Sequence, residues 1–299
     1  MREVIESHLH GSIERIEVQG GGFSPAFAGI LTTDSGDEVF VKTGGPELNP
    51  GVPTYYRREW AIASALPAVL PTPRALWFED DGRRVALAFE AIHGGNPRLP
   101  WRRDDLNRVL RALETMTRQL TPSPIWARSL GEKNAEILRG FRTLYAEEGV
   151  ADGRYPTLDP WVTRHLNQLA KLESQWEEST GGTTLLHCDV RADNIVVRKG
   201  QVFFVDWAGG CIGPPWIELL LFLPSVSMQG GQSHGSFSTG ANLLKECHLG
   251  PSVLFWLPSL DILLSDPCAL LLRSFPLYGN SKTARVSRLC PGLKGFCPS

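Results

Sequence analysis

Four polar side chains in the second half of the chain have types and spacing suited to phosphoryl transfer. Within LLHCDVRADNIVVRKGQVFFVDW (185–207), His187, Asp189 and Asn194 form the pattern H-x-D-x-x-x-x-N, and Asp206 ends the run QVFFVD. A separate carboxylate, Asp189, can orient an incoming hydroxyl and accept its proton. Asn194 and Asp206 can supply the oxygen ligands that Mg²⁺ prefers. We therefore predict His187 and Asp189 as catalytic residues and Asn194 and Asp206 as magnesium ligands.

A β-hairpin would bring these side chains together. NIVV and VFFV are strand-forming runs separated by the turn RKGQ, which is suited to a tight reversal. Such a hairpin makes Asn194 and Asp206 neighbours, with Asp189 in the loop that leads in. The simpler alternative is that these side chains cap turns. However, a buried strand that ends on an unpaired carboxylate is costly, and a metal ion or fixed hydrogen bonds would offset that cost.

A glycine loop near the N-terminus could hold phosphate. Gly20, Gly21 and Gly22 lie between two predicted strands, so their turn could bring backbone N–H groups against phosphate oxygens. No G-K-[ST] follows, which argues against a Walker A loop, and a strand comes next, which argues against a Rossmann fingerprint. A glycine-rich hairpin that covers a nucleotide is the remaining interpretation.

A lysine and a glutamate could position the phosphates. In EVFVK, strand alternation places Lys42 on the same face as Phe40. Glu59 follows seventeen residues later on a predicted helix and could pair with Lys42, aiming the ammonium at phosphate oxygens. The alternative is that both side chains are solvated surface charges.

The elements that must position these residues suggest two parts. SIERIEV, FAGILTT, EVFVK, ALWF and RVALAF read as strands of an antiparallel sheet, interrupted by one helix over Tyr55–Leu66. Glu90–Pro100 has linker composition. Beyond it, apolar spacing predicts helices over Asp104–Leu120 and Trp161–Trp176. We predict an α+β fold with a small antiparallel β lobe and a larger, mainly helical lobe.

These motifs resemble those of the aminoglycoside phosphotransferase and choline kinase-like family over residues 12–225. The resemblance implies a two-lobed protein-kinase-like fold, with an N-terminal nucleotide-binding lobe (1–92) and a C-terminal catalytic lobe (93–225). It implies that nucleotide binds under the glycine loop and beside the linker, where Phe89, Glu90 and Ile92 are candidate cofactor-binding residues. It also implies that Asp189 is the base and that Lys42 and Glu59 are the phosphate-positioning pair.

Three features depart from the family pattern. Cys188 stands where many relatives carry glycine, and Pro214 and Glu218 replace the two acids usual in the segment after the metal-binding aspartate. From residue 226 the chain loses helical periodicity and holds only three of the 32 acidic residues but four of the six cysteines. Residues 226–299 are therefore either a divergent end or the product of a shifted reading frame.

Composition excludes several classes of protein. The chain has 299 residues, 42% hydrophobic and 21% charged, which is typical of folded soluble proteins. A formal charge of -2 gives no global footprint for nucleic acid or a membrane. The first residues lack the apolar core of a secretory signal, and aspartates and prolines interrupt the longest apolar run. Six cysteines without a C-x-x-C pair fit reduced thiols, and we predict a cytoplasmic protein.

The predicted activity is ATP-dependent and requires Mg²⁺. The γ-phosphate would pass to a hydroxyl of a small molecule, such as an aminoglycoside-like compound, an amino alcohol or a sugar. Two alternatives stay open. The first is a non-catalytic nucleotide-binding protein that has lost its acceptor site. The second is a metallohydrolase with His187, Asp189 and Asp206 as metal ligands, although this leaves the glycine loop and Lys42 unexplained.

Overall fold

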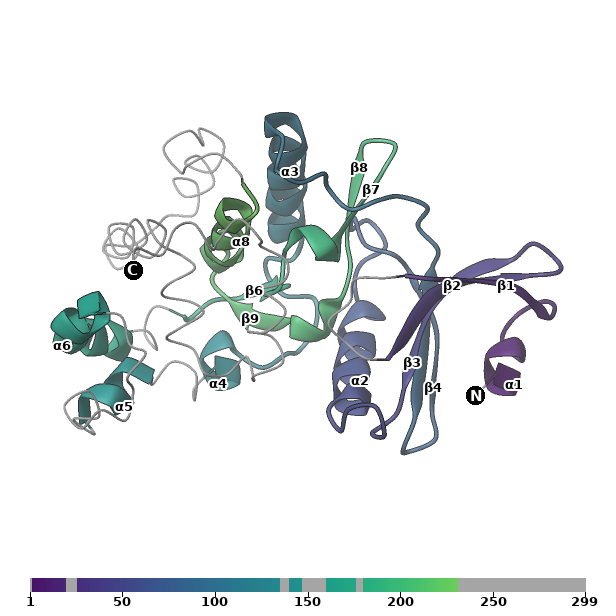
Figure 1. Cartoon of the computed structure of the whole chain (residues 1–299), viewed down its shortest axis with the longest axis horizontal. Coiled ribbons are helices and arrows are strands. Elements are labelled where there is room, and N and C mark those ends of the chain that lie inside the picture. The colour runs from purple at the N-terminus through teal and green to yellow at the C-terminus, as the bar shows by residue number, and fades with distance from the viewer. Residues whose placement is uncertain (1, 20–25, 135–139, 147–159, 176–179, 231–299) are drawn as a thin grey trace, which may run out of the picture. The chain divides into compact units, whose positions relative to one another are not determined.

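The computed structural model describes residues 2–19, 26–134, 140–146, 160–175 and 180–230 (Figure 1). The chain divides into two compact units, one formed by Met1–Ser129 with Gly182–His248 and the other by Leu130–Gly181 with Leu249–Ser299. The lobe boundary predicted after residue 92 lies inside the first unit and stays a prediction. Most of the unusual segment 226–299 lies outside the described residues.

An antiparallel sheet forms the N-terminal part of the first unit (Figure 1). Its strands have the order β1-β2-β3-β5-β4 and every neighbouring pair is antiparallel. The strands are β1 (Ile13–Val18), β2 (Phe27–Thr33), β3 (Glu38–Gly44), β4 (Ala75–Asp80) and β5 (Val85–Glu90). The predicted order of three strands, one helix and two strands is confirmed, and a short additional helix, α1 (Arg2–Glu6), precedes it. Helix α1 could not be predicted, because five residues are too few to show a helical period.

Helix α2 (Val52–Ala63) connects β3 to β4. It begins three residues before the predicted start at Tyr55, because Pro53 is accepted in the first helical turn, where its missing N–H has no intrahelical partner. The sheet is covered on both sides along β5. Leu87 belongs to the main core with α2, whereas Ala88 packs in a second cluster with α1. The unbroken apolar run VALAF is the pattern expected of such a strand.

Alternation along β3 separates two sets of side chains. Val39 and Val41 are buried in the cluster with Ile5 and Leu31, and Phe40 packs against the opposite, main core. Lys42 continues the Phe40 face, as predicted, and this places its ammonium on the side of α2.

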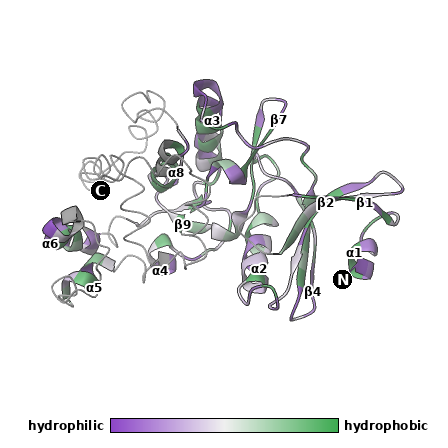
Figure 2. Cartoon of the chain, in the orientation of Figure 1, coloured by the Kyte–Doolittle hydropathy of each residue, from purple (hydrophilic) through white to green (hydrophobic). Residues whose placement is uncertain are grey.

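The rest of the first unit surrounds the same core. It contains α3 (Arg103–Gln119), β6 (Thr184–Leu186), β7 (Ile195–Arg198), β8 (Gln201–Phe204), β9 (Cys211–Gly213) and α8 (Trp216–Met228), with single 3-10 turns η2 (Ala192–Asn194) and η3 (Trp207–Gly209). Helix α3 buries one apolar face and keeps hydrophilic residues on the other, and Figure 2 shows both colours along it. Its buried residues are Leu106, Val109, Leu110, Leu113, Met116 and Thr117. Together with the sheet, these elements confirm the α+β class.

The predicted hairpin is present. β7 pairs with β8 in antiparallel register, and Lys199 and Gly200 form the turn with φ of 48° and 83°. Two consecutive positive φ angles match the twist of the flanking strands, and glycine adopts the second without steric cost.

The second unit contributes helices α4 (Leu130–Asn134), α5 (Gly140–Ala146) and α6 (Pro160–Ser174). α5 and α6 are joined by Glu173, whose carboxylate accepts the backbone N–H groups of Phe141 and Arg142 at 3.2 and 2.7 Å. These donors lie in the first turn of α5, which has no intrahelical partner for them. In the part of the chain that the structure describes, no helix has the length and apolar character needed to cross a bilayer.

Candidate active site

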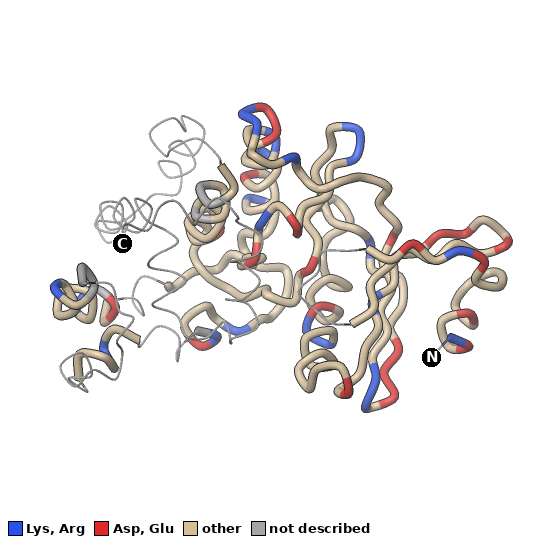
Figure 3. The backbone as a smooth tube through the Cα atoms, viewed as in Figure 1, with Lys and Arg blue, Asp and Glu red and all other residues tan. Residues whose placement is uncertain are grey.

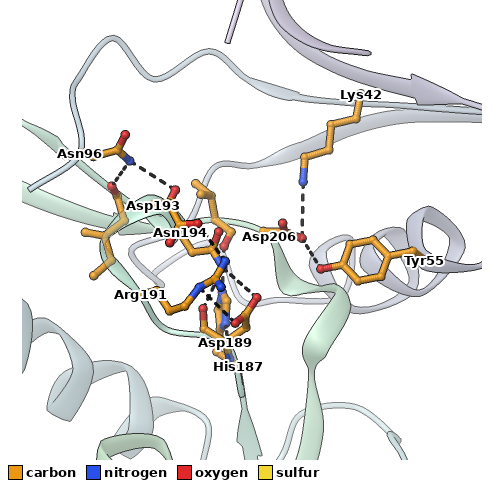
Figure 4. Close-up of polar contacts among 11 residues, drawn as sticks. Lys42, Tyr55, Asn96, His187, Asp189, Arg191, Asp193, Asn194 and Asp206 are labelled. Atoms are coloured by element: carbon orange, nitrogen blue, oxygen red, sulfur yellow. Dashed lines mark hydrogen bonds and ion pairs between the residues drawn. The ribbon is translucent and has the colours of Figure 1, made fainter. Parts of the chain in front are cut away.

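The loop between β6 and η2 carries the predicted base. Nδ2 of Asn194 donates to both Oδ2 and the backbone oxygen of Asp189, at 3.1 and 2.8 Å (Figure 4). These two bonds close the loop on itself and fix the carboxylate. Because Nδ2 points at Asp189, the amide oxygen Oδ1 of Asn194 is directed the other way, where it can serve as a ligand for a cation.

The predicted metal-binding aspartate lies at the end of the hairpin. The N–H of Val205 donates to the backbone oxygen of Asn194 at 3.0 Å, so Asp206 follows directly beside the catalytic loop. Asp206 has φ of 69° and ψ of 65°, a left-handed conformation that aspartate accepts more readily than most residues. The prediction that the hairpin brings Asn194 and Asp206 together is confirmed.

Lys42 reaches the same place from the sheet. Its Nζ lies 3.6 Å from Oδ1 of Asp206 and 2.6 Å from Oε1 of Glu59. The Lys42 side chain is 12% exposed and that of Glu59 only 2%, which confirms that they pair and excludes the alternative of two solvated charges. Burial alone would lower the pKa of Lys42, but the carboxylates of Glu59 and Asp206 outweigh it and raise the pKa above its usual value. Burial raises the pKa of Glu59, and the Lys42 ammonium opposes that shift.

Breaking this pair should destabilise the fold. Oε2 of Glu59 has no hydrogen-bond partner, so Lys42→Met would leave both buried oxygens unpaired. We expect the free energy of unfolding to fall by about 3 kcal/mol or more in Lys42→Met. The double variant Lys42→Met/Glu59→Leu should recover most of that loss, since no buried charge remains, yet stay inactive.

Urea denaturation of Lys42→Met, Glu59→Leu and the double variant measures the coupling between Lys42 and Glu59. Arg58→Gln is the matched control, because Arg58 is the exposed neighbour of Glu59 on the same helix and should change stability by less than about 0.5 kcal/mol. Equal stability of Lys42→Met and the wild type would contradict the expectation.

Tyr55 was not predicted from the sequence, yet it contacts the site. Its hydroxyl donates to Oδ1 of Asp206 at 3.1 Å, and Figure 4 shows Tyr55 and Lys42 converging on this carboxylate. Burial, followed by the nearby carboxylates of Asp206 and Asp189, raises the pKa of Tyr55, so the hydroxyl keeps its proton as the donor. Its spacing of four residues before Glu59, which places both on one face of α2, is the signal that could have identified it.

The electrostatics of Asp189 combine burial with mixed charges. Burial raises the pKa of Asp189, the guanidinium of Arg191 lowers it, and the carboxylate of Asp206 raises it. Nε of Arg191 lies 3.4 Å from Oδ1 of Asp189, while another of its nitrogens lies 2.8 Å from Asp193. The carboxylate is therefore held in place but only partly compensated.

His187 is completely buried beside this loop. Its Nε2 donates to the backbone oxygen of Val205 at 2.9 Å, and its Nδ1 accepts the N–H of Asp189 at 3.3 Å. The tautomer with the proton on Nε2 satisfies both bonds. The ring also packs against Trp207 at 4.7 Å between centroids. With both nitrogens occupied, His187 ties the catalytic loop to the end of the hairpin.

Glu218 accepts hydrogen bonds from the backbone of the loop that carries Asp189. It is 1% exposed, lies in the first turn of α8, and is the only charged residue of that helix, which is otherwise uncharged in Figure 3. Its two oxygens accept the backbone N–H groups of His187 and Cys188, the latter at 3.0 Å. Glu218 thus holds the loop through its backbone.

Removing this anchor should weaken the first unit. Glu218→Ala leaves two buried N–H groups without an acceptor, and each unsatisfied donor costs about 1–3 kcal/mol. We expect the free energy of unfolding to fall by about 2 kcal/mol or more in urea titrations. Glu218→Gln retains one oxygen and should give an intermediate loss. A Glu218→Ala protein as stable as the wild type would show that the two bonds contribute nothing.

The residues present fit magnesium better than a metal held by protein alone. Among the described residues, no group of three or more His, Cys, Asp or Glu side chains could hold a metal ion. Mg²⁺ is usually bound through one or two side chains together with phosphate oxygens and water. Asp206 and Asn194 match that requirement. His187 is buried and both of its ring nitrogens are already hydrogen-bonded, which also argues against the metallohydrolase alternative.

Of the three predicted linker residues, Phe89 and Glu90 are the last residues of β5, and only Ile92 follows the strand. Phe89 is buried in the main core, Glu90 forms an ion pair with Arg74 at 3.3 Å, and Ile92 is half-buried just after β5. The structure therefore puts the Phe89 side chain in the core, so its predicted contact with a nucleotide would have to use the backbone. Gly20, Gly21 and Gly22 lie outside the described residues.

Asn96 was also not predicted. Its Nδ2 donates to the backbone oxygens of Asp193 and Ile195 at 3.3 and 2.9 Å (Figure 4). Gly95 pairs with Val197 in both directions, at 2.8 and 3.2 Å. These contacts link the linker to the hairpin across about a hundred residues of sequence, and no local pattern predicts them.

A protein-family profile matches most of the chain. Residues 18–236 match the profile described as "Phosphotransferase enzyme family" (APH). This span includes all the site residues described above, and it ends ten residues after the change of character at 226. No curated protein matches the chain.

Solved structures with a similar fold include one kinase and two aminoglycoside phosphotransferases. Amicoumacin kinase hAmiN, in complex with AMP-PNP, Ca²⁺ and Ami, is 12% identical with a TM-score of 0.56, covering 100% of this chain and 97% of that one. An aminoglycoside-3'-phosphotransferase of type VIII is 20% identical with a TM-score of 0.51, covering 87% and 96%. A thermostable mutant of aminoglycoside phosphotransferase APH(4)-Ia, in a ternary complex with ADP and hygromycin B, is 13% identical with a TM-score of 0.52, covering 100% and 99%. These similarities confirm the predicted kinase-like fold.

Proposed function

The chain belongs to the phosphotransferase enzyme family, and we propose from this premise that it transfers the γ-phosphoryl group of ATP to a hydroxyl of a small molecule. The observation that carries the proposal is the meeting of Lys42 and Asp206. Their charged atoms lie 3.6 Å apart although 163 residues separate them, and Glu59 holds Lys42 from behind. A lysine beside a metal-type carboxylate suits a nucleotide triphosphate with its cation.

The roles follow from the contacts. Asp189 orients the acceptor hydroxyl and takes its proton, while Asn194 and His187 hold the loop that carries it. Lys42, positioned by Glu59, binds phosphate oxygens and stabilises the charge that spreads over them. Asp206 and Asn194 would hold Mg²⁺, which when bound neutralises charge on the phosphates. Gly20, Gly21 and Gly22 would cover the phosphates. Glu90 and Ile92 would lie beside the nucleobase of ATP.

Two similar structures support a nucleotide donor, because one was solved with AMP-PNP and another with ADP. Their other ligands, Ami and hygromycin B, are among the acceptors to test. Amino alcohols and sugars complete the panel, since they share the hydroxyl that the reaction requires. We propose no single acceptor among them.

The test has a binding arm and a turnover arm. Calorimetry should show ATP binding that depends on Mg²⁺, and incubation with each acceptor should release ADP in step with a phosphorylated product seen by mass spectrometry. Binding without any phosphorylated product across the panel would favour the non-catalytic alternative. Absence of ATP binding in the wild-type protein would overturn the proposal as a whole.

A further inference from the structure

Two cysteine thiols meet directly beside the predicted base. Sγ of Cys188 lies 3.0 Å from Sγ of Cys211, and Cys188 stands between His187 and Asp189. The phosphotransferase roles above use neither sulfur. We propose that this pair is an oxidation site, at which a peroxide closes a Cys188–Cys211 disulfide that slows phosphoryl transfer until a dithiol reduces it. The bond itself is independent of the proposed function, whereas its effect on turnover rests on that function.

The sheet brings the two sulfurs together. β6 pairs with β9 so that Leu186 lies opposite Cys211, and Cys188 follows two residues later. Cys188 lies just beyond the end of β6, and diagonal neighbours across a strand pair lie within reach of each other. Glu218 holds the backbone N–H of Cys188 at this point. The approach of the sulfurs therefore follows from strand register and a buried anchor.

The backbone of Cys188 has a conformation that favours glycine. Its φ is 62°, in the left-handed region where glycine is unstrained and an L residue costs about 1–2 kcal/mol. A cysteine thus adds strain to the catalytic loop together with a reactive sulfur, and no conformational advantage offsets that strain.

The exposure of the two cysteines determines which thiol reacts first. Cys188 is half-buried and Cys211 completely buried, so a peroxide reaches Cys188 first. Its thiol would attack hydrogen peroxide, giving a sulfenic acid and one water. The Cys211 thiol would then attack the sulfenic sulfur, forming the S–S bond and releasing a second water. The two thiols lose two electrons and two protons to the peroxide, and a dithiol returns them by exchange.

Closing the bond would draw Cys188 toward Cys211. A disulfide is about 2.05 Å long, so the sulfurs have to approach by about 1 Å. Cys211 lies within a strand pair and Cys188 in a loop, so we expect Cys188 and its neighbour Asp189 to take up part of this shift against the hold of Glu218. A displacement of about 1 Å at a reacting group can lower a rate by about 10²-fold. We expect turnover to fall at least about tenfold in the oxidised protein.

The full chain can be tested by peptide mapping. The reduced protein is treated with a few equivalents of hydrogen peroxide, its remaining thiols are alkylated with iodoacetamide, and it is digested with trypsin without reduction. Trypsin places Cys188 in Leu172–Arg191 and Cys211 in Gly200–Lys245, and each peptide contains a single cysteine. The expected product is these two peptides joined, from a monomeric band on a non-reducing gel, and it should disappear after dithiothreitol.

Cys188→Gly and Cys211→Ala are the control variants. Glycine suits the φ of Cys188, so Cys188→Gly should fold, and both variants should lose the joined peptide and the peroxide sensitivity of turnover. Both cysteines found alkylated while peroxide has modified other thiols would overturn the proposal, as would a joined peptide with unchanged turnover. A reduced protein without phosphotransferase activity would contradict the proposed function instead, and the peptide map would still decide the disulfide.

Discussion

Asp189→Asn should lower turnover by about 10³-fold while leaving ATP binding nearly unchanged. A positioned base contributes about 10²–10⁴-fold to proton transfer, and asparagine lacks the basic oxygen. The substitution keeps the size of the side chain and an oxygen that can still accept the hydrogen bond from Asn194. Single-turnover measurements with an acceptor that the wild-type protein phosphorylates, beside calorimetric ATP affinity, separate a loss of chemistry from a loss of binding.

Asp193→Asn is the matched control for that experiment. Asp193 lies in the same loop and pairs with Arg191, but it has no role in the proposed transfer, so turnover should change less than tenfold. The pH profile gives a second readout. Burial raises the pKa of Asp189 above the ordinary value of 3.8, and the base works only when deprotonated. Wild-type turnover should therefore fall as the pH decreases toward that raised pKa, and the residual turnover of Asp189→Asn should lack this decline.

Asp206→Asn should abolish the Mg²⁺-dependent part of ATP binding and lower turnover by at least about 10²-fold. The carboxylate supplies the only full negative charge among the two proposed magnesium ligands, and comparable charge-stabilising groups are worth about 10²–10³-fold in rate. Asparagine is the appropriate replacement because it also accepts the left-handed backbone of this position. Calorimetric titration of ATP with and without Mg²⁺ measures the first effect.

Tyr55→Phe separates the effect of the Asp206 charge from the effect of its hydrogen bond with Tyr55. It removes the donor to Oδ1 of Asp206 but leaves the charge, so the magnesium dependence should persist and turnover should change less than tenfold. If Asp206→Asn bound ATP with the wild-type response to Mg²⁺, the metal assignment of Asp206 would be wrong.

The sequence was informative where the contacts are local. The hairpin could be predicted because its turn and strands are neighbours in the chain, and it alone places Asp206 beside Asn194. The face of Lys42 followed from strand alternation. Glu59 could be proposed as its partner because the helix after the strand carries one acid in a buried stripe.

Other features could not be predicted, because they depend on how distant elements pack. The Tyr55 contact to Asp206 spans 151 residues, and its geometry requires α2 to lie beside η3. The contact between Cys188 and Cys211 depends on the β6 and β9 register, and each of these strands is only three residues long. Such short strands have no periodicity that a sequence can show.

The crossing from the sheet to the hairpin has a mechanical consequence. On one side of it, Nε2 of His93 lies 2.5 Å from Oε2 of Glu38 on β3. On the other, Gly95 and Asn96 are bonded to the hairpin. Gly94 alone separates the two attachments, and a methyl group there would meet β7 backbone at 2.6 Å. The linker is therefore anchored on both sides of Gly94, and any side chain at this position would have to displace the backbone of β7, the strand of the hairpin that it now follows closely.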